Sequence, residues 1–337
     1  MKKKILFICG SMNITTQMQQ IAQELPEYEK FFTPFYADGF IKFLNKLKLV
    51  EFTIIGEKRA GECHRYLEAQ KLPIDYGGTQ RDYDLIVTCS DLVVQKNIKD
   101  KKRIVVQEGI TDPEKFAFHL VKTFKFLPKW FAGTSANGIS NNFDYYCVAG
   151  EGYRELFIRK GVKPEKIRVT GIPNFDNCQK YCDNDFPHKG YVLVCTSDLR
   201  EKFRYENRKK FIKKALEIAN RRQLIFKLHP NEKFERRTAE IKKLAPDALV
   251  YTSGSAEEMI ANSEALITSY SSTIYVGLAL GKEVYSVLDM DELRQLTPVQ
   301  NGCAARHIAD VCRELIGGEQ RLDEPVSSSN KQIPAHA

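Results

Sequence analysis

Two short polar segments follow apolar runs in the second half of the chain, and their side chains are suited to binding phosphate. His229 and Pro230 follow the run LIFKL, and the proline ends the run, which puts the imidazole at a sheet edge. Ser271, Ser272 and Thr273 come shortly after a second run, ALI. Because imidazole and hydroxyl groups can donate to phosphate oxygens, the two segments together predict a phosphate site.

Each of these side chains also has a structural interpretation. A hydroxyl at a helix start caps the exposed backbone donors, and a single histidine can be a hydrogen-bonded core residue. Three consecutive hydroxyls are more than one cap requires. The sequence therefore favours an anion site at the amino end of the helix that follows.

Polar residues follow other apolar runs as well. In the second half, Thr196 and Ser197 come directly after YVLVC, Arg200 follows at a spacing of four from Thr196, and Ser269 ends the run ALIT. These are further candidates for contacts to the phosphate. They belong to the same predicted sheet edge because ligands of such sheets bind beyond the carboxyl ends of the strands.

The first half offers a candidate base. Gly10 and Ser11 follow the run KILFIC, but GSMN lacks the glycine spacing of a dinucleotide fingerprint. Gln107 and Glu108 follow RIVV and precede a glycine. A carboxylate at this edge, opposite a phosphate site, could take a proton from an attacking hydroxyl. The alternative is that Glu108 is a surface or helix-capping residue.

Short apolar runs alternate with segments of helical period along the chain, which is typical of parallel sheets covered on both faces. The predicted strands lie at 4–9, 52–55, 84–90, 103–109, 145–150, 166–171, 191–197, 224–230, 248–253, 265–269 and 283–287. The predicted helices lie at 15–25, 60–71, 113–124, 151–161, 207–222, 234–245, 256–263, 271–280 and 304–318. The predicted fold class is α/β, with two Rossmann-like doubly wound domains facing across a cleft.

The rhythm of strands and helices breaks once, in a segment rich in Pro, Asn and Asp, which we interpret as the interdomain linker. We therefore expect an acceptor-side domain over 1–172, a linker over 173–190, and a nucleotide-donor domain over 191–318. The polar segment 319–337 is expected to be disordered.

The composition is that of a globular protein without a membrane span: 43% of the 337 residues are hydrophobic and 28% are charged. The nine cysteines are an odd number in mostly apolar contexts, which predicts reduced thiols and a cytoplasmic location. Cys178 and Cys182 form the one close pair, and without a second pair they do not predict a zinc site. The net charge of +8 favours phosphorylated substrates, nucleic acid or an anionic membrane.

Two segments combine lysines with apolar residues, at 40–50 and 122–131. Each is either a solvated basic face or a surface for the inner face of a membrane, where lipid-linked acceptors reside. The loop 131–142 either lines the acceptor side of the cleft or is a plain surface loop. The basic helix at 207–222 lacks interleaved aromatic residues, so no nucleic-acid partner is expected.

The order of these segments resembles that of bacterial GT-B transferases, in particular the CDP-glycerol glycerophosphotransferase and capsule polysaccharide transferase group, and it is also similar to sialyltransferases with HP and SS motifs. The resemblance covers about residues 100 to 290 and rests on QEG, Gly171, Pro173, Asp176, His229-Pro230 and SYSST.

The resemblance implies a transferase that needs neither a cofactor nor a catalytic metal, with His229, Ser271 and Ser272 on the donor phosphate. Thr196, Ser197 and Arg200 match the family's Thr-x-Arg contact loosely. Glycerophosphotransferases commonly have His before the glycine of QEG, whereas sialyltransferases have an acidic residue there. Glu108 therefore favours sugar transfer, from a CMP- or CDP-activated donor rather than a UDP-sugar, to a glycan or lipid-linked glycan.

Three alternatives stay open. A glycerophosphotransferase shares most of these motifs. A UDP-N-acetylhexosamine 2-epimerase has the same two-domain architecture, but it usually carries Ser-Gly-Gly where this chain has Ser271, Ser272 and Thr273. A basic protein that binds polyanions without catalysis would also account for the net charge of +8.

Overall fold

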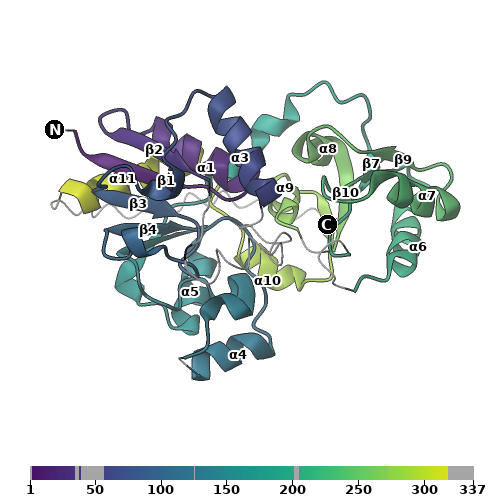
Figure 1. Ribbon diagram of the computed structural model, residues 1–337. Coiled ribbons are helices and arrows are strands. Elements are labelled where there is room, and N and C mark those ends of the chain that lie inside the picture. The colour runs from purple at the N-terminus through teal and green to yellow at the C-terminus, as the bar shows by residue number, and fades with distance from the viewer. Residues whose placement is uncertain are drawn as a thin grey trace.

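The strands form two separate parallel sheets, each with helices on both faces (Figure 1). The structure is a computed structural model that describes residues 2–34, 38, 57–124, 126–200, 205–269 and 271–317. Every strand pairing within these residues is parallel. The α/β class with two doubly wound domains is thus confirmed.

The first sheet has six strands in the order β2-β1-β3-β4-β5-β6. Its strands are β1 (Lys4–Ile8), β2 (Glu29–Thr33), β3 (Leu85–Thr88), β4 (Arg103–Val106), β5 (Tyr145–Val148) and β6 (Ile167–Val169). The helices along this part are α1 (Met12–Gln23), α3 (Glu57–Ala69), α4 (Phe116–Thr123) and α5 (Glu151–Lys160). Short 3-10 turns are η1 (Tyr76–Gly78), η2 (Lys96–Ile98), η3 (Lys129–Ala136) and η4 (Pro164–Lys166).

The second sheet has five strands in the order β11-β10-β7-β8-β9. Its strands are β7 (Tyr191–Cys195), β8 (Leu224–Lys227), β9 (Leu249–Tyr251), β10 (Ser263–Thr268) and β11 (Glu283–Tyr285). The accompanying helices are α6 (Arg208–Ala219), α7 (Phe234–Leu244), α8 (Ala256–Asn262), α9 (Thr273–Ala279), α10 (Met290–Gln295) and α11 (Ala304–Gly317). The connection between the sheets contains η5 (Pro173–Phe175) and η6 (Cys178–Cys182).

The central strands are apolar throughout because both of their faces are covered. All residues of β3, β4 and β7 are buried. Since a parallel strand between two helix layers has no solvent face, its sequence is a continuous apolar run rather than an alternation. This is why the runs LIVT, RIVV and YVLVC predict these strands directly.

One strand of the first sheet was not expected from the sequence. The edge strand β2 has the sequence EKFFT, and only its last two residues are buried. Such a short, half-exposed strand has no continuous apolar run to mark it. The predicted strand at 52–55, the basic segment at 40–50 and the predicted disordered tail at 319–337 lie outside the described residues.

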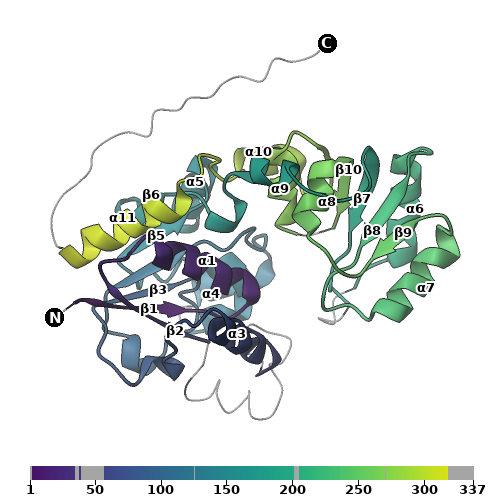
Figure 2. The ribbon, with the colours of Figure 1, turned by 90° about the horizontal axis from the view of Figure 1, so that it is seen from above.

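The last helix, α11, packs on the first domain although it follows the second sheet in the chain. Its Ile308, Ala309 and Cys312 belong to the same hydrophobic cluster as Ile5 and Phe7 of β1. Figure 2 shows α11 beside α1 and the first sheet. The predicted second domain, 191–318, had included this helix. The helical period of the sequence shows that α11 has an apolar face, but it does not show which domain that face packs against.

The two domains share part of one hydrophobic cluster. Tyr153 of α5 and Tyr275 of α9 are both fully buried, and their hydroxyls form a hydrogen bond across the domain boundary. A Cβ built on Gly152 would lie 2.1 Å from the carbonyl oxygen of Gln295, so only glycine fits at this contact. The sheet edges are therefore held in a defined relation, with a cleft between them.

Candidate functional site

A cavity of about 490 Å³ lies at the junction of the two domains. Both domains and the connection between them contribute to its walls. Its lining residues are Asn13, Thr16, Gln20, Asn174, Phe175, Lys180, Tyr181, His229, Glu257, Ser271, Ser272 and Thr273. The cavity thus lies at the carboxyl ends of the strands, where parallel sheets commonly bind ligands.

His229 lies just beyond β8 and is held in place through its backbone and its ring. Its backbone N–H donates to Oγ1 of Thr196 and to a carboxylate oxygen of Glu232, both at 3.1 Å. Its Nδ1 accepts the N–H of Asn231 at 3.2 Å, and a carboxylate oxygen of Asp198 lies 3.8 Å from the same nitrogen. With a proton on Nε2, the ring is a hydrogen-bond donor suited to an anionic oxygen.

A buried charged cluster lies behind the loop that carries His229. Glu232 is ion-paired with Arg237 at 3.2 Å and with Arg208 at 3.5 Å, and the Arg237 side chain is completely buried. Burial, the largest influence, raises the pKa of Glu232, while the hydrogen bond from Thr196 and the charge of Arg237 act in the opposite direction. This cluster fixes the loop from below, because Glu232 bonds both Thr196 and the His229 backbone.

The three hydroxyls at the start of α9 line the cavity and also make local contacts. Oγ of Ser271 accepts the N–H of Thr273 at 3.3 Å and the Thr273 hydroxyl at 3.0 Å. Oγ of Ser272 accepts the N–H of Ile110, from the first domain, at 3.1 Å. The N-cap residue of α9 is Ser272, and its side chain makes no capping bond within the helix. Through Ser272 the run instead links the two domains at the wall of the cavity.

Glu108 lines a second, smaller cavity of about 190 Å³ next to the first. Its Oε1 accepts hydrogen bonds from Asn13 Nδ2 at 3.2 Å and from Ser11 Oγ at 3.3 Å. The lining residues are Asn13, Gln107, Glu108, Gly109, Ile110, Thr111, Thr134, Asn137 and Ser272. Asn13 and Ser272 line both cavities, so the two cavities share a wall.

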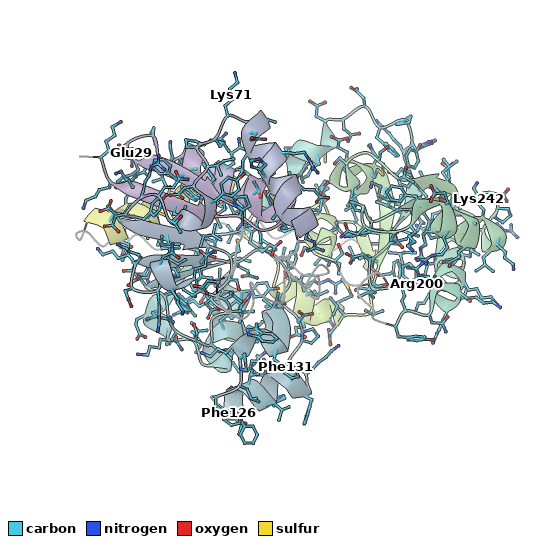
Figure 3. The ribbon with its side chains drawn as sticks, in the orientation of Figure 1. Glu29, Lys71, Phe126, Phe131, Arg200 and Lys242 are labelled. Carbon is cyan, nitrogen blue, oxygen red and sulfur yellow. The ribbon has the colours of Figure 1, made fainter. Side chains whose placement is uncertain are left out.

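Three of the predicted phosphate ligands lie elsewhere. Thr196 does not line the large cavity; it supports the loop of His229. The hydroxyl of Ser197 donates to Glu206 at 3.1 Å. Arg200, labelled on the second domain in Figure 3, is ion-paired with Glu240 at 3.0 Å. The spacing of these residues after β7 indicated a shared sheet edge, but acidic partners in the same domain bind their polar groups.

Five other residues were predicted as cleft candidates, and three of them, Ser269, Gln107 and Ser11, make hydrogen bonds within the protein. Ser269 donates to Glu206 at 3.2 Å, and Pro230 is exposed beside His229. Gln107 is buried, and its amide accepts the N–H of Ala149 at 2.9 Å, although it lines the smaller cavity. Gly10 lies in the turn before α1, and Ser11 is the N-cap of that helix in addition to its bond to Glu108.

Several lining residues were not among the sequence candidates. Lys180 and Tyr181 belong to η6, in the segment interpreted as a linker, and Glu257 lies in the first turn of α8. Asn174 donates to the side chain of Asn13 at 2.7 Å and so attaches the linker to α1. The sequence could have indicated Asn13 as a lining residue, because GSMN follows the first predicted strand directly. The linker residues lie in a segment without helical or strand period, so the sequence did not indicate them.

The loop 131–142 takes part in the smaller cavity through Thr134 and Asn137. These two residues line a cavity, and the prediction that the loop lies on the acceptor side of the cleft stays a prediction. Among the residues that the structure describes, no group of three His, Cys, Asp or Glu side chains is placed to hold a metal ion.

Comparison with known proteins gives matches in structure only. No family model matches the sequence, and no curated protein matches it. MnaA from S. aureus, solved with UDP, has a TM-score of 0.61 and 12% identity over 96% of this chain and 100% of that one. A UDP-GlcNAc 2-epimerase from Neisseria meningitidis, bound to UDP-GlcNAc, has a TM-score of 0.57 and 12% identity over 92% and 100%.

The wall teichoic acid polymerase TagF is also similar, with a TM-score of 0.51 and 14% identity over 94% of this chain and 89% of that chain. At such identities the likeness concerns the fold, which extends over nearly the whole chain. The chain therefore has the two-domain GT-B fold that these enzymes share.

Proposed function

We propose that the protein is a glycosyltransferase that moves a sugar from a nucleotide donor to a surface-glycan acceptor. One observation carries the proposal: the cavity lined by His229 and Ser271–Thr273 shares a wall with the cavity lined by Glu108. A displacement reaction needs a base on one side of the reacting carbon and a stabilised leaving group on the other. The two adjacent cavities offer these two environments.

In this reaction the acceptor oxygen bonds to the anomeric carbon of the sugar while the bond from that carbon to the nucleotide phosphate breaks. Glu108 takes the proton of the acceptor hydroxyl. The phosphate leaves with the bonding electron pair, and its negative charge is met by His229 and by the hydroxyls of Ser271, Ser272 and Thr273. Each such charge-assisted hydrogen bond contributes about 1–3 kcal/mol.

The large cavity is lined by two basic side chains and one carboxylate. Lys180 and His229 supply the basic groups of its lining, and Glu257 supplies the carboxylate. Lysine adds a point charge for phosphate, and a carboxylate can accept hydrogen bonds from sugar hydroxyls. This composition supports a phosphorylated, hydroxyl-rich ligand such as a nucleotide sugar.

The donor is proposed to carry cytidine rather than uridine, following the HP motif. A thermal-shift screen against CMP, CDP, UDP, GDP and ADP tests the site and the base together, because a ligand that binds only the folded protein raises its melting temperature. We expect CMP or CDP to give the largest shift. Absence of a shift with all five nucleotides would contradict a donor site in this cleft.

A UDP-N-acetylhexosamine 2-epimerase is the second candidate, because the epimerase folds superpose over nearly the whole chain. One observation favours the transferase instead. Glu108 is the carboxylate among the residues lining the smaller cavity. Asp91 is not among them, and it accepts hydrogen bonds from Gly138 at 2.8 Å and from the hydroxyl of Ser140. One base suffices for transfer, but epimerisation also has to return a proton to carbon.

The two candidates separate in one experiment without an acceptor. UDP-GlcNAc is incubated with the protein, and the sugar is followed by proton NMR. A transferase leaves the configuration at carbon 2 unchanged, whereas an epimerase produces the manno isomer. Appearance of that isomer would replace the proposal with the epimerase reading.

A further inference from the structure

An exposed aromatic patch lies at the end of the first domain that carries α4. Five large aromatic side chains are exposed within a stretch of the chain that spans α4 and η3. These side chains define the α4–η3 patch: Phe116 (77% exposed), Phe124 (45%), Phe126 (82%), Trp130 (42%) and Phe131 (60%). Figure 3 shows Phe126 at the outermost end of the domain in that view, with Phe131 close to it. Large aromatic side chains gathered in this way mark an interaction surface.

The helix that carries the patch, α4, is packed firmly against the first domain. On the inner side of α4, Phe118 and Val121 are almost completely buried. Lys160 of α5 contacts this inner side, with its ammonium 5.7 Å from the Phe118 ring centre, and donates to the carbonyl of Ser135. The exposed aromatic residues are therefore carried by a helix and a turn that are packed against the rest of the domain.

The charges of this stretch have one sign. Between residues 115 and 131 the sequence contains four lysines and one histidine and neither Asp nor Glu. Lys115 and Lys122 are exposed, and Lys129 is half-buried. The acidic residues Asp112 and Glu114 precede the patch. Asp112 accepts a hydrogen bond from the hydroxyl of Thr134 at 2.7 Å, which holds it against η3.

From this arrangement we propose that the α4–η3 patch docks the protein on an anionic lipid bilayer. Phenylalanine and tryptophan side chains enter the boundary between headgroups and acyl chains, and lysines around them bind anionic headgroups. An apolar groove on a protein partner would explain the exposed aromatic side chains, but it would not explain why residues 115–131 contain lysines and no acidic residue. No helix within the described ranges is long and apolar enough to cross a membrane.

The patch is connected directly to the smaller cavity. Phe131 and Thr134 lie in the same turn, η3, and Thr134 lines the cavity that contains Glu108. Docking would thus bring the acceptor side of the cleft close to the bilayer. This step rests on the proposed function and identifies the acceptor as one carried on a membrane lipid. The docking itself does not depend on catalysis.

Vesicle co-sedimentation of the full chain tests the docking. Vesicles of phosphatidylcholine mixed with phosphatidylglycerol are compared with vesicles of phosphatidylcholine alone. We expect binding to the anionic vesicles, weakened by high salt. The double variant Phe126→Ser with Phe131→Ser should bind about tenfold more weakly, and Lys115→Gln with Lys122→Gln should lose a similar factor. These side chains are exposed, so the variants are expected to fold.

Matched controls lie on the second domain. Tyr205→Ser removes an aromatic side chain that is 88% exposed, and Lys213→Gln with Lys214→Gln removes two lysines from α6. Both should leave vesicle binding unchanged. Equal losses in the α6 variant would show nonspecific charge attraction and overturn the proposal, as would wild-type protein that does not bind anionic vesicles.

The docking and the transferase proposal fail separately. Nucleotide-induced thermal shifts are measured on the same preparations without vesicles. If the nucleotide shift persists while vesicle binding is absent, the membrane inference falls and the donor site stays. If vesicle binding depends on Phe126 and Phe131 while no nucleotide binds, the docking surface stays and the transferase proposal falls.

Discussion

Gly109 of the first domain lies directly against Ser272 of the second: a Cβ built on Gly109 would be 2.4 Å from the Ser272 hydroxyl oxygen and 3.2 Å from its Cβ. The neighbouring N–H of Ile110 donates to the same hydroxyl at 3.1 Å. This contact joins the two domains between the cavity of Glu108 and the cavity of His229. Its geometry therefore controls how the proposed base and the proposed phosphate site face each other.

A methyl group at position 109 should displace the Ser272 hydroxyl and break its hydrogen bond with Ile110. Gly109→Ala is expected to destabilise the protein by about 1–3 kcal/mol, as measured by urea unfolding, and to lower turnover. Ser272→Gly removes both colliding atoms, so the double variant should recover part of the stability lost in Gly109→Ala. Additive losses in this double-mutant cycle would show that the two positions do not interact.

Replacing the proposed base should separate binding from chemistry. Glu108→Gln keeps an oxygen acceptor for Ser11 and Asn13, so the local structure should persist. We expect nucleotide affinity to stay within about twofold of wild type and turnover to fall by about 100- to 10,000-fold. Equilibrium nucleotide binding and an assay of sugar transfer on the same preparation make the comparison. Unchanged turnover would remove Glu108 from the role of base.

The buried cluster behind His229 should matter for stability. Glu232→Gln removes the nearest of three carboxylates around the fully buried Arg237, and Glu206 at 3.8 Å and Glu240 at 3.6 Å remain. The loss should therefore lie below the about 3–5 kcal/mol of a fully unpaired buried charge but above that of a surface pair. Urea unfolding should show this loss. Glu264→Gln is the matched control, because Glu264 is more than half exposed and pairs with Arg222 at the surface, where such pairs contribute about 0–1 kcal/mol. Equal effects of the two changes would contradict the structural role of Glu232.

The buried thiols should be unreactive in the folded protein. Burial raises the pKa of Cys147 and of Cys195 to about 12, so almost no thiolate forms at neutral pH. Cys182 is exposed, and Cys303 is partly exposed. A thiol reagent should label Cys182 first, and Cys182→Ser should remove the fastest phase. Rapid labelling of Cys147 or Cys195 without denaturant would show that the first or second sheet opens readily.

The sequence predicted the parts of the fold and site that depend on local pattern. Continuous apolar runs identify buried parallel strands, and the residues after those runs include His229 and Glu108. Contacts between elements that are distant in the sequence depend on tertiary packing, which the local pattern does not show. Sequence period does not show that α11 covers the first domain, that Thr196 supports the His229 loop, or that Lys180 and Tyr181 of the linker line the cavity.

The role of Ser272 could not be read from its position in the chain. Three hydroxyls before a helix predict a cap or an anion site, and both interpretations concern the second domain alone. The structure adds a third contact, from the N–H of Ile110 in the first domain. A bond between residues 162 positions apart leaves no mark on local sequence pattern, so only the folded chain reveals it.

The central claim is that His229 and Ser272 hold the donor phosphate, and the affinity of the best nucleotide from the screen, measured by calorimetry, tests it most directly. His229→Ala and Ser272→Ala should each lower that affinity by about 5- to 150-fold, which corresponds to about 1–3 kcal/mol per contact. Arg200→Ala, which removes a side chain paired with Glu240 outside the cavity lining, should leave it unchanged. Full wild-type affinity in both the His229 and the Ser272 variants would contradict the account.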